Sequence, residues 1–127
     1  MDLTPLIPAG RQIIESYGDR RFRVSGRLFE GSIIVFPDRT LAWPVADQAA
    51  VDEASLAEVR AAGEAGRIDV LLLGCGARMA LVGEGLRRSL REAGIVIEPM
   101  DTGAACRTYN VLAAEGRRVA AALIAVA

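Results

Sequence analysis

The chain has 127 residues, 52% of them hydrophobic and 24% charged, with a formal net charge of −1. This length suits one domain that buries about two thirds of its unfolded surface, and the near-neutral charge gives no field that would draw the protein to nucleic acid. Histidine and lysine are both missing, which excludes Ser-His-Asp and Cys-His catalysis, His-containing zinc sites, Schiff-base chemistry and the lysine of a Walker A loop.

The first half of the chain predicts short antiparallel strands. Four strands are expected, at residues 13–17, 21–24, 28–36 and 41–43. The second alternates apolar and charged side chains, as a half-buried strand does, and Ser25-Gly26 joins it to the third as a two-residue hairpin turn. Gly31 interrupts the third run, where we expect a bulge.

The second half predicts helices and strands in alternation. Three helices are expected, at residues 52–62, 84–93 and 102–115, and three strands, at residues 68–73, 95–98 and 118–126. Asp52 is suited to cap the first helix, and Pro99 is expected to end the second strand. The last segment is rich in alanine, which favours a helix, but it directly follows the helix-ending Gly116, and we interpret it as a buried strand.

This order predicts an α/β protein, a single layered domain spanning residues 1–127. N-terminal antiparallel hairpins are followed by α-β-α-β-α-β. Antiparallel hairpins and parallel crossovers in one sheet require a mixed central β-sheet.

A candidate binding rim lies where two predicted strands end. Residues 74–76 follow one strand and residues 99–102 follow the next, so neighbouring parallel strands would bring both loops to one edge. The third helix begins there with free backbone N–H groups, and Gly103, Arg107 and Asn110 share one of its faces. The candidate residues are Gly74, Cys75, Gly76, Asp101, Thr102, Arg107, Tyr109 and Asn110.

Two interpretations of this rim stay open. It is either a small polar pocket or partner-binding crevice, with Asp101 as acid or base and Arg107 as an anion clamp, or a structural junction. In the second case Asp101 and Thr102 cap the helix, and Arg107 pairs with a carboxylate such as Asp101. Cys75 is the one plausible nucleophile, although a free cysteine at a strand end is usually a small hydrophobe, and Cys106 is expected in the core.

Two other patterns are interpreted without a ligand. Residues 74–79 share two glycines with the dinucleotide-binding motif G-x-G-x-x-G, but Met79 stands where that motif has its last glycine, so we reject the motif. A basic patch on the hairpin has no interleaved aromatic residues and is read as a solvated face formed by Arg20, Arg21, Arg23 and Arg27.

The C-terminal part of the chain carries a dense set of motif residues. They are Met100-Asp101-Thr102, Ala105-Cys106-Arg107-Thr108-Tyr109-Asn110, Glu115-Gly116-Arg117 and Val119-Ala120-Ala121-Ala122-Leu123. Earlier pieces are Ser16-Tyr17-Gly18, Phe22, Val24, Gly31-Ser32-Ile33, Trp43 and Leu71-Leu72-Leu73-Gly74-Cys75-Gly76. With these residues the chain resembles, over nearly its whole length, the family of the mitochondrial complex I (NADH dehydrogenase) assembly factor 3 proteins and their uncharacterised bacterial and archaeal relatives.

The resemblance implies a compact α/β domain with a mixed central sheet, a C-terminal strand and no established catalytic activity. The position after Gly74 is commonly threonine in the family, whereas this chain has Cys75, so the resemblance argues against a shared catalytic role for that side chain. In mitochondria the family assists the assembly of a membrane-bound respiratory complex.

Two hypotheses about function follow. The first, implied by the resemblance and in keeping with the missing histidine and lysine, is a non-enzymatic assembly or interaction factor for a respiratory or membrane protein complex. Its protein partner would be a respiratory-complex subunit or another assembly factor. The second is a domain or weak enzyme that binds a small molecule, an anion or a carbonyl, at the rim formed by residues 74–76 and 100–110.

The sequence also gives expectations about location and cofactors. The segment MDLTPLIPAGRQ lacks a basic start and an apolar core, so no secretory signal is expected, and no run is long enough to span a membrane. We therefore expect a cytoplasmic protein whose two cysteines are thiols, with peripheral association at the inner membrane left open. No cofactor, metal or nucleic-acid partner is predicted.

Overall fold

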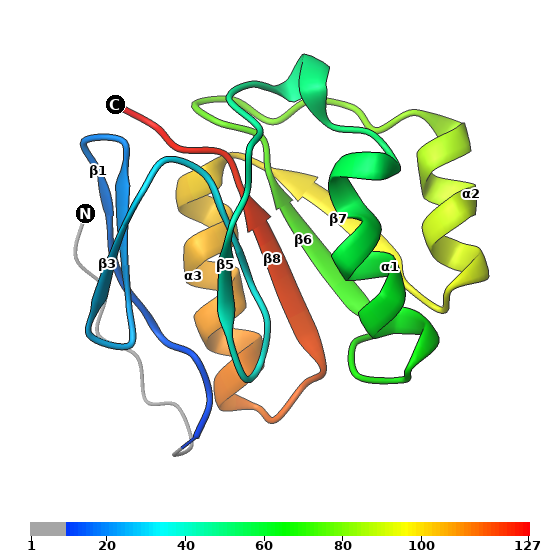
Figure 1. The fold of residues 1–127 in the computed structure, drawn as a ribbon, viewed down its shortest axis with the longest axis horizontal. Coiled ribbons are helices and arrows are strands. Elements are labelled where there is room, and N and C mark those ends of the chain that lie inside the picture. Colours follow the sequence, from blue (N-terminus) through cyan, green and yellow to red (C-terminus); the bar gives the residue numbers. More distant parts are fainter. Residues whose placement is uncertain (1–9) are drawn as a thin grey trace.

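The computed structural model describes residues 10–127 and contains two β-sheets (Figure 1). The three-stranded sheet has the order β1-β2-β3, and the five-stranded sheet has the order β5-β4-β8-β6-β7. The strands are β1 Ile14–Gly18, β2 Arg21–Val24, β3 Arg27–Glu30, β4 Ile33–Val35, β5 Thr40–Ala42, β6 Val70–Gly74, β7 Val96–Met100 and β8 Val119–Leu123. The expectation about a secretory signal rests mainly on residues 1–9, which lie outside this described part.

Helices and the smaller sheet cover the larger sheet on its two faces. Residues 10–127 contain the helices α1 (Ala57–Glu64), α2 (Glu84–Glu92) and α3 (Thr102–Ala114), and short 3₁₀ turns at Gln48–Ala50 and Ala54–Leu56. α1 and α2 lie on one face of the larger sheet, and α3 and the three-stranded sheet lie on the other (Figure 1). Among these helices, none has both the length and the apolar character that a membrane crossing requires.

The central strands of the larger sheet are buried on both faces, which explains their continuous apolar runs. In β6, Leu71 and Leu73 belong to the core under α1 and α2, whereas Leu72 belongs to the core under α3. β8, the predicted final strand, lies between β4 and β6, and every one of its residues is buried. The predicted α/β class with a mixed sheet is confirmed, because β6 is parallel to β7 and β8 while β4 is antiparallel to β5 and β8.

The prediction of one strand over residues 28–36 is wrong. β3 pairs with β2 in the smaller sheet, whereas β4 pairs with β5 and β8 in the larger one. Gly31 marks the corner between them rather than a bulge, with a φ of 80°, and its N–H donates to the carbonyl of Arg20 at 2.9 Å. Glycine adopts this conformation without a steric penalty, and the chain can therefore leave one sheet and enter the other at this residue.

Pro99 lies inside β7 rather than ending it, so this prediction is also wrong. β7 is an edge strand of the larger sheet. The N–H of Val96 donates to the carbonyl of Asp69 at 3.0 Å, in the direction of β6. Backbone groups alternate in direction along a strand, so those of Pro99 point to the free edge, where the missing N–H removes no bond between strands.

Tight turns connect the strands of the smaller sheet. Ser25 and Gly26 both have positive φ, 47° and 82°, as the predicted hairpin turn requires. Asp19 and Arg20 adopt the same conformation, with φ of 52° and 57°, although neither is glycine. The N–H of Arg20 donates to the carbonyl of Val126 at 2.7 Å, so this turn is fixed by the chain that follows β8.

Asp52 holds the entry to the first helical segment, as predicted. The N–H of Ser55 donates to Oδ1 of Asp52 at 2.8 Å, and the N–H of Asp52 donates to Oγ of Ser55 at 3.0 Å. The turn that follows is 3₁₀, and the α-helix itself begins only at Ala57.

Candidate functional site

The two loops of the candidate rim lie side by side. β6 and β7 are parallel neighbours, with Gly74 paired to Met100. Beyond the strands, the N–H of Cys75 donates to the carbonyl of Met100 and the N–H of Thr102 donates to the carbonyl of Gly76, both at 2.8 Å. Backbone hydrogen bonds therefore close the space between the loops.

Thr102 ties the rim to the last strand. Its side chain is fully buried, and Oγ1 accepts from the N–H of Gly76 at 2.9 Å and donates to the carbonyl of Ile124 at 2.7 Å. The N–H of Ile124 in turn donates to the carbonyl of Gly74 at 2.9 Å. A Cβ atom on Gly74 would lie 3.1 Å from the Cα of Thr102, so glycine allows this close approach. The one hydroxyl proton of Thr102 is therefore already used in the hydrogen bond to Ile124 and is not available for donation to a substrate.

Asp101 is the N-cap of α3. Its backbone is extended, and its carboxylate accepts from the N–H of Ala104 at 2.8 Å. A carboxylate at this position satisfies one of the free N–H groups and interacts favourably with the positive end of the helix dipole. The structural interpretation of Asp101 thus accounts for the geometry of this residue.

The two thiols lie in apolar surroundings. Cys75 is 8% exposed, and its Sγ is 3.6 Å from the carbonyl oxygen of Leu73 and 3.9 Å from that of Ala80. Cys106 is fully buried in the core under α3, and burial raises the pKa of its thiol to about 12. Cys106 therefore stays protonated at neutral pH and is not a nucleophile there.

The face of α3 that carries Gly103, Arg107 and Asn110 packs against β1. The side chain of Asn110 accepts from the N–H of Ile14 at 3.1 Å and donates to its carbonyl at 2.8 Å. A Cβ atom on Gly103 would lie 2.6 Å from the hydroxyl of Tyr17, and Nη1 of Arg107 lies 3.2 Å from that same hydroxyl. The structure thus uses this face as a contact between helix and sheet.

The suggested ion pair between Arg107 and Asp101 is not formed. The two residues are six positions apart on α3, so they project from different sides of the helix. Arg107 is exposed, and its partner on the described chain is the hydroxyl of Tyr17.

Tyr109 lies away from the rim, in the core between α3 and the sheets. It is fully buried, and its hydroxyl lies 3.3 Å from the carbonyl oxygen of Gln12 and 3.4 Å from that of Phe36. Burial raises the pKa of this phenol above its ordinary range. Its role is to join the segment before β1, the end of β4 and α3.

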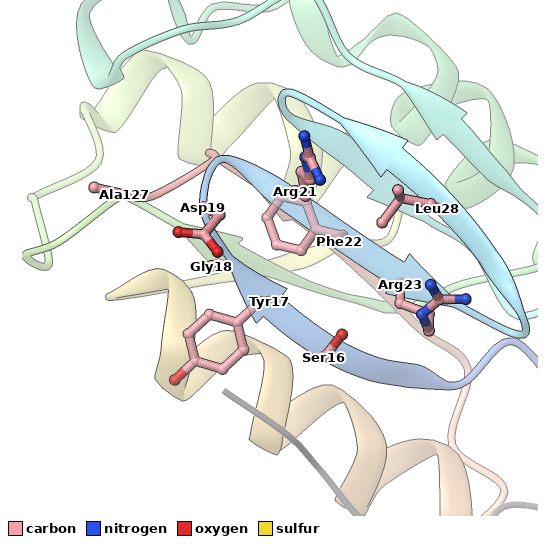
Figure 2. A pocket seen from close by; sticks show the side chains of 9 residues that line it. All are labelled: Ser16, Tyr17, Gly18, Asp19, Arg21, Phe22, Arg23, Leu28 and Ala127. Atoms are coloured by element: carbon pink, nitrogen blue, oxygen red, sulfur yellow. The ribbon is translucent and has the colours of Figure 1, made fainter.

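An open hollow lies along the strands of the smaller sheet (Figure 2). It encloses about 470 Å³ and is lined by Ser16, Tyr17, Gly18, Asp19, Arg21, Phe22, Arg23, Leu28 and Ala127. Ser16, Arg23 and Leu28 are paired across the three strands. Arg21 forms an exposed ion pair with Glu30 at 3.5 Å. All four arginines of the predicted basic patch are exposed.

Sequence reasoning did not single out the exposed apolar residues. Met79 and Leu81, in the loop between β6 and α2, are 56% and 85% exposed. Val96 in β7 and Val111 in α3 are 54% and 56% exposed. Their signal in the sequence is weak, because an apolar residue in a predicted strand or helix is assigned to the core by default. Within residues 10–127, no cluster of three or more His, Cys, Asp or Glu side chains is placed to hold a metal ion.

Comparison with known proteins confirms the family resemblance. A family model described as "Protein of unknown function (DUF498/DUF598)" matches residues 14–124. An uncharacterised protein of Rhodobacter capsulatus is 40% identical, over 91% of this chain and 86% of its own length. NADH dehydrogenase [ubiquinone] 1 alpha subcomplex assembly factor 3 of Danio rerio is 36% identical over 88% of this chain, which spans only 63% of that relative. The crystal structure of an outer membrane protein from Bartonella henselae superimposes with a TM-score of 0.85 and 37% identity, covering 96% of this chain and 100% of the other.

Proposed function

This chain belongs to the DUF498/DUF598 family, and we propose that it is a non-enzymatic assembly factor for a respiratory NADH dehydrogenase complex. The observation that carries the proposal is the 36% identity to the Danio rerio assembly factor over 88% of this chain. The family match runs from residue 14 to residue 124, so it includes both sheets and all three helices of residues 10–127.

The geometry of the rim argues for a structural role of its side chains and against a catalytic one. The carboxylate of Asp101 caps α3, the hydroxyl of Thr102 bridges two backbone groups, and Asn110 bonds to both backbone groups of Ile14. Side chains engaged in this way position elements of the fold. The protein then acts through its surfaces, and its partner is a subunit of the complex or another assembly factor.

The place of action follows from that partner. A protein that binds a respiratory complex during its assembly works at the inner membrane, where its partner holds it. We therefore propose a protein of the cytoplasm with peripheral association at that membrane.

Deletion of the gene in the native host tests the function. We expect loss of assembled NADH dehydrogenase complex on native gels and of NADH:quinone oxidoreductase activity in membranes, both restored by the wild-type gene. Tagged chain purified from the same cells should carry subunits of the complex or other assembly factors. Normal complex levels in the deletion strain, together with recovery of none of these proteins, would contradict the proposal.

Complementation by variants separates binding from catalysis. Cys75→Ser should restore the complex as well as wild type, because the thiol makes only weak contacts with two carbonyls. If Cys75→Ser folds but fails to complement, the thiol itself would be required for function. That result would contradict a non-enzymatic role.

A further inference from the structure

The larger sheet is covered unequally on its two faces. α1 lies in front of the sheet in Figure 1 with α2 beside it, and Ile95 and Ile97 pack into the core that these helices share. On the other face, α3 packs mainly on β6 and β8 and makes few contacts with β7. β7 is therefore a strand with one covered face and one open face.

Apolar residues with one carboxylate between them make up the open face of β7. Val96 is 54% exposed, Glu98 is exposed and Met100 is half-buried, and these alternate residues point to the side of α3. On α3, Thr108 and Leu112 are also half-buried and lie on the flank turned away from β1. Val96, Glu98, Met100, Thr108 and Leu112 are called the β7 face below.

The outer edge of β7 is closed to a partner strand. Pro99 has no N–H, and the carbonyl of Ile97, which points to the same edge, already accepts from the guanidinium of Arg87 at 3.2 Å. A partner strand at this edge would therefore find no N–H donor at Pro99 and no free carbonyl at Ile97. A partner must therefore lie across the β7 face, and the element that covers a sheet face in an α/β protein is a helix.

Glu98 gives this face a charge preference. Its carboxylate is exposed between Val96 and Met100 and forms no ion pair with any residue of 10–127. A partner that buries the two apolar side chains also removes water from the carboxylate, which is costly unless a cation pairs with it. The matching surface is thus an apolar stripe with one basic residue.

We propose that the β7 face binds an amphipathic helix of a partner protein, with a Lys or Arg of that helix paired to Glu98. The helix lies beside α3 and completes the layer that α3 begins. The inference rests on the proposed function in one respect, since it takes the partner to be a protein of the assembly process.

Photo-crosslinking in the native host tests the site. The full chain carries p-benzoylphenylalanine in place of Val96 in one strain and in place of Leu81 in a control strain, because Leu81 is also an exposed apolar residue but lies in the loop between β6 and α2. Mass spectrometry of the crosslinked peptides should identify one helical segment of one protein from position 96 and not from position 81.

Charge exchange then tests the pairing. Glu98→Arg should lower the crosslink yield from position 96 by about tenfold, as expected when one member of an interfacial charge pair is reversed, with an unchanged melting temperature. Exchange of the basic residue of the captured helix for glutamate should restore the yield in the Glu98→Arg chain.

Four outcomes would overturn the proposal. Position 96 could crosslink only to a second copy of the chain, or only to lipid. Position 81 could capture the same segment with equal yield, or position 96 could form no crosslink. Failure of the site is distinguishable from failure of the proposed function. If no crosslink forms while the deletion strain lacks the complex, the function stands and the β7 face is not its site. Capture of a basic amphipathic helix from a protein unrelated to respiration supports the site and counts against the function.

Discussion

The two flanks of α3 meet opposite surroundings. One flank, with Gly103, Arg107 and Asn110, is docked on β1. The opposite flank, with Thr108 and Leu112, is turned toward the side of β7 and is only half-buried. Asn110 on the docked flank is polar and yet only 6% exposed. Leu112 on the open flank is apolar and yet only half-buried.

An irregularity in β1 explains the polar residue on the docked flank. The pairing of β1 with β2 shifts register between Ile14 and Ser16, and the backbone N–H and carbonyl of Ile14 bond to the side chain of Asn110. Buried backbone groups need partners, and a side-chain amide offers both a donor and an acceptor. The docked flank is therefore polar because it completes the hydrogen bonding of a strand.

The largest expected effect comes from breaking the docked flank. Asn110→Ala removes both partners of the Ile14 backbone, and we expect a loss of about 2–4 kcal/mol in the free energy of unfolding. Urea titration followed by circular dichroism measures it. The matched control is Thr108→Ala on the open flank, which should change stability by about 0.5 kcal/mol or less. Similar losses for both variants would remove the distinction between the flanks.

The buried side of α3, between the two flanks, carries Cys106, and its burial can be tested by the pH dependence of stability. Burial raises the pKa of Cys106 from its ordinary 9.0 to about 12. Above pH 9 the unfolded chain releases the thiol proton while the folded chain keeps it, so this contribution to stability is present below pH 9 and is lost as the pH rises toward 12. The slope for one such group reaches about 1.4 kcal/mol per pH unit.

Comparison of two proteins isolates the contribution of Cys106. Urea titrations of wild type and Cys106→Ala at about pH 8 and about pH 11 should show a smaller loss of stability in the variant. The raised pKa of Tyr109 acts in the same direction in both proteins, so it cancels in the comparison. Equal losses in the two proteins would mean that Cys106 is not shielded from water as the structure places it.

A smaller effect is expected at the outer margin of the docked flank. Arg107 is exposed and donates one hydrogen bond to Tyr17 at 3.2 Å. Arg107→Ala should therefore cost about 1 kcal/mol or less, since an exposed bond of this kind competes with water. A loss above about 2 kcal/mol would show that the guanidinium holds the smaller sheet more firmly than this contact accounts for.

The smallest effect is expected on the solvent side of α3, at Val111. Val111→Ala removes an exposed side chain and raises helix propensity, so stability should stay the same or rise by about 0.5 kcal/mol. Thermal unfolding at two protein concentrations measures it. A clear loss that depends on concentration would reveal that another copy of the chain covers this side of α3.

Local patterns in the sequence were sufficient where the deciding interactions are local. Gly116 before the alanine-rich segment identified β8, Asp52 and Ser55 marked a helix entry, and Ser25-Gly26 marked a turn. The helical period also grouped Gly103, Arg107 and Asn110 on one face. It could not tell what that face touches, because β1 lies about ninety residues away in the chain.

The errors have a shared physical origin in long-range pairing. Residues 28–36 look like one strand because the chain stays extended, and the switch of sheets at Gly31 is visible only from the partners of β3 and β4. Pro99 was expected to end β7, and it is tolerated there because the strand lies at an edge. The open face of β7 escaped detection for a related reason, since burial of Val96 depends on which strand is outermost.

The position of β8 has a consequence for the folding of the chain. β8 follows the other described strands in the sequence, yet it lies between β4 and β6 in the finished sheet. Without β8 the larger sheet would fall into two separate strand pairs, β4 with β5 and β6 with β7, each with an unpaired edge. Such edges attract other strands, and closing a sheet through distant pairings is slow. The chain is thus most exposed to misassociation through its strand edges before β8 is in place.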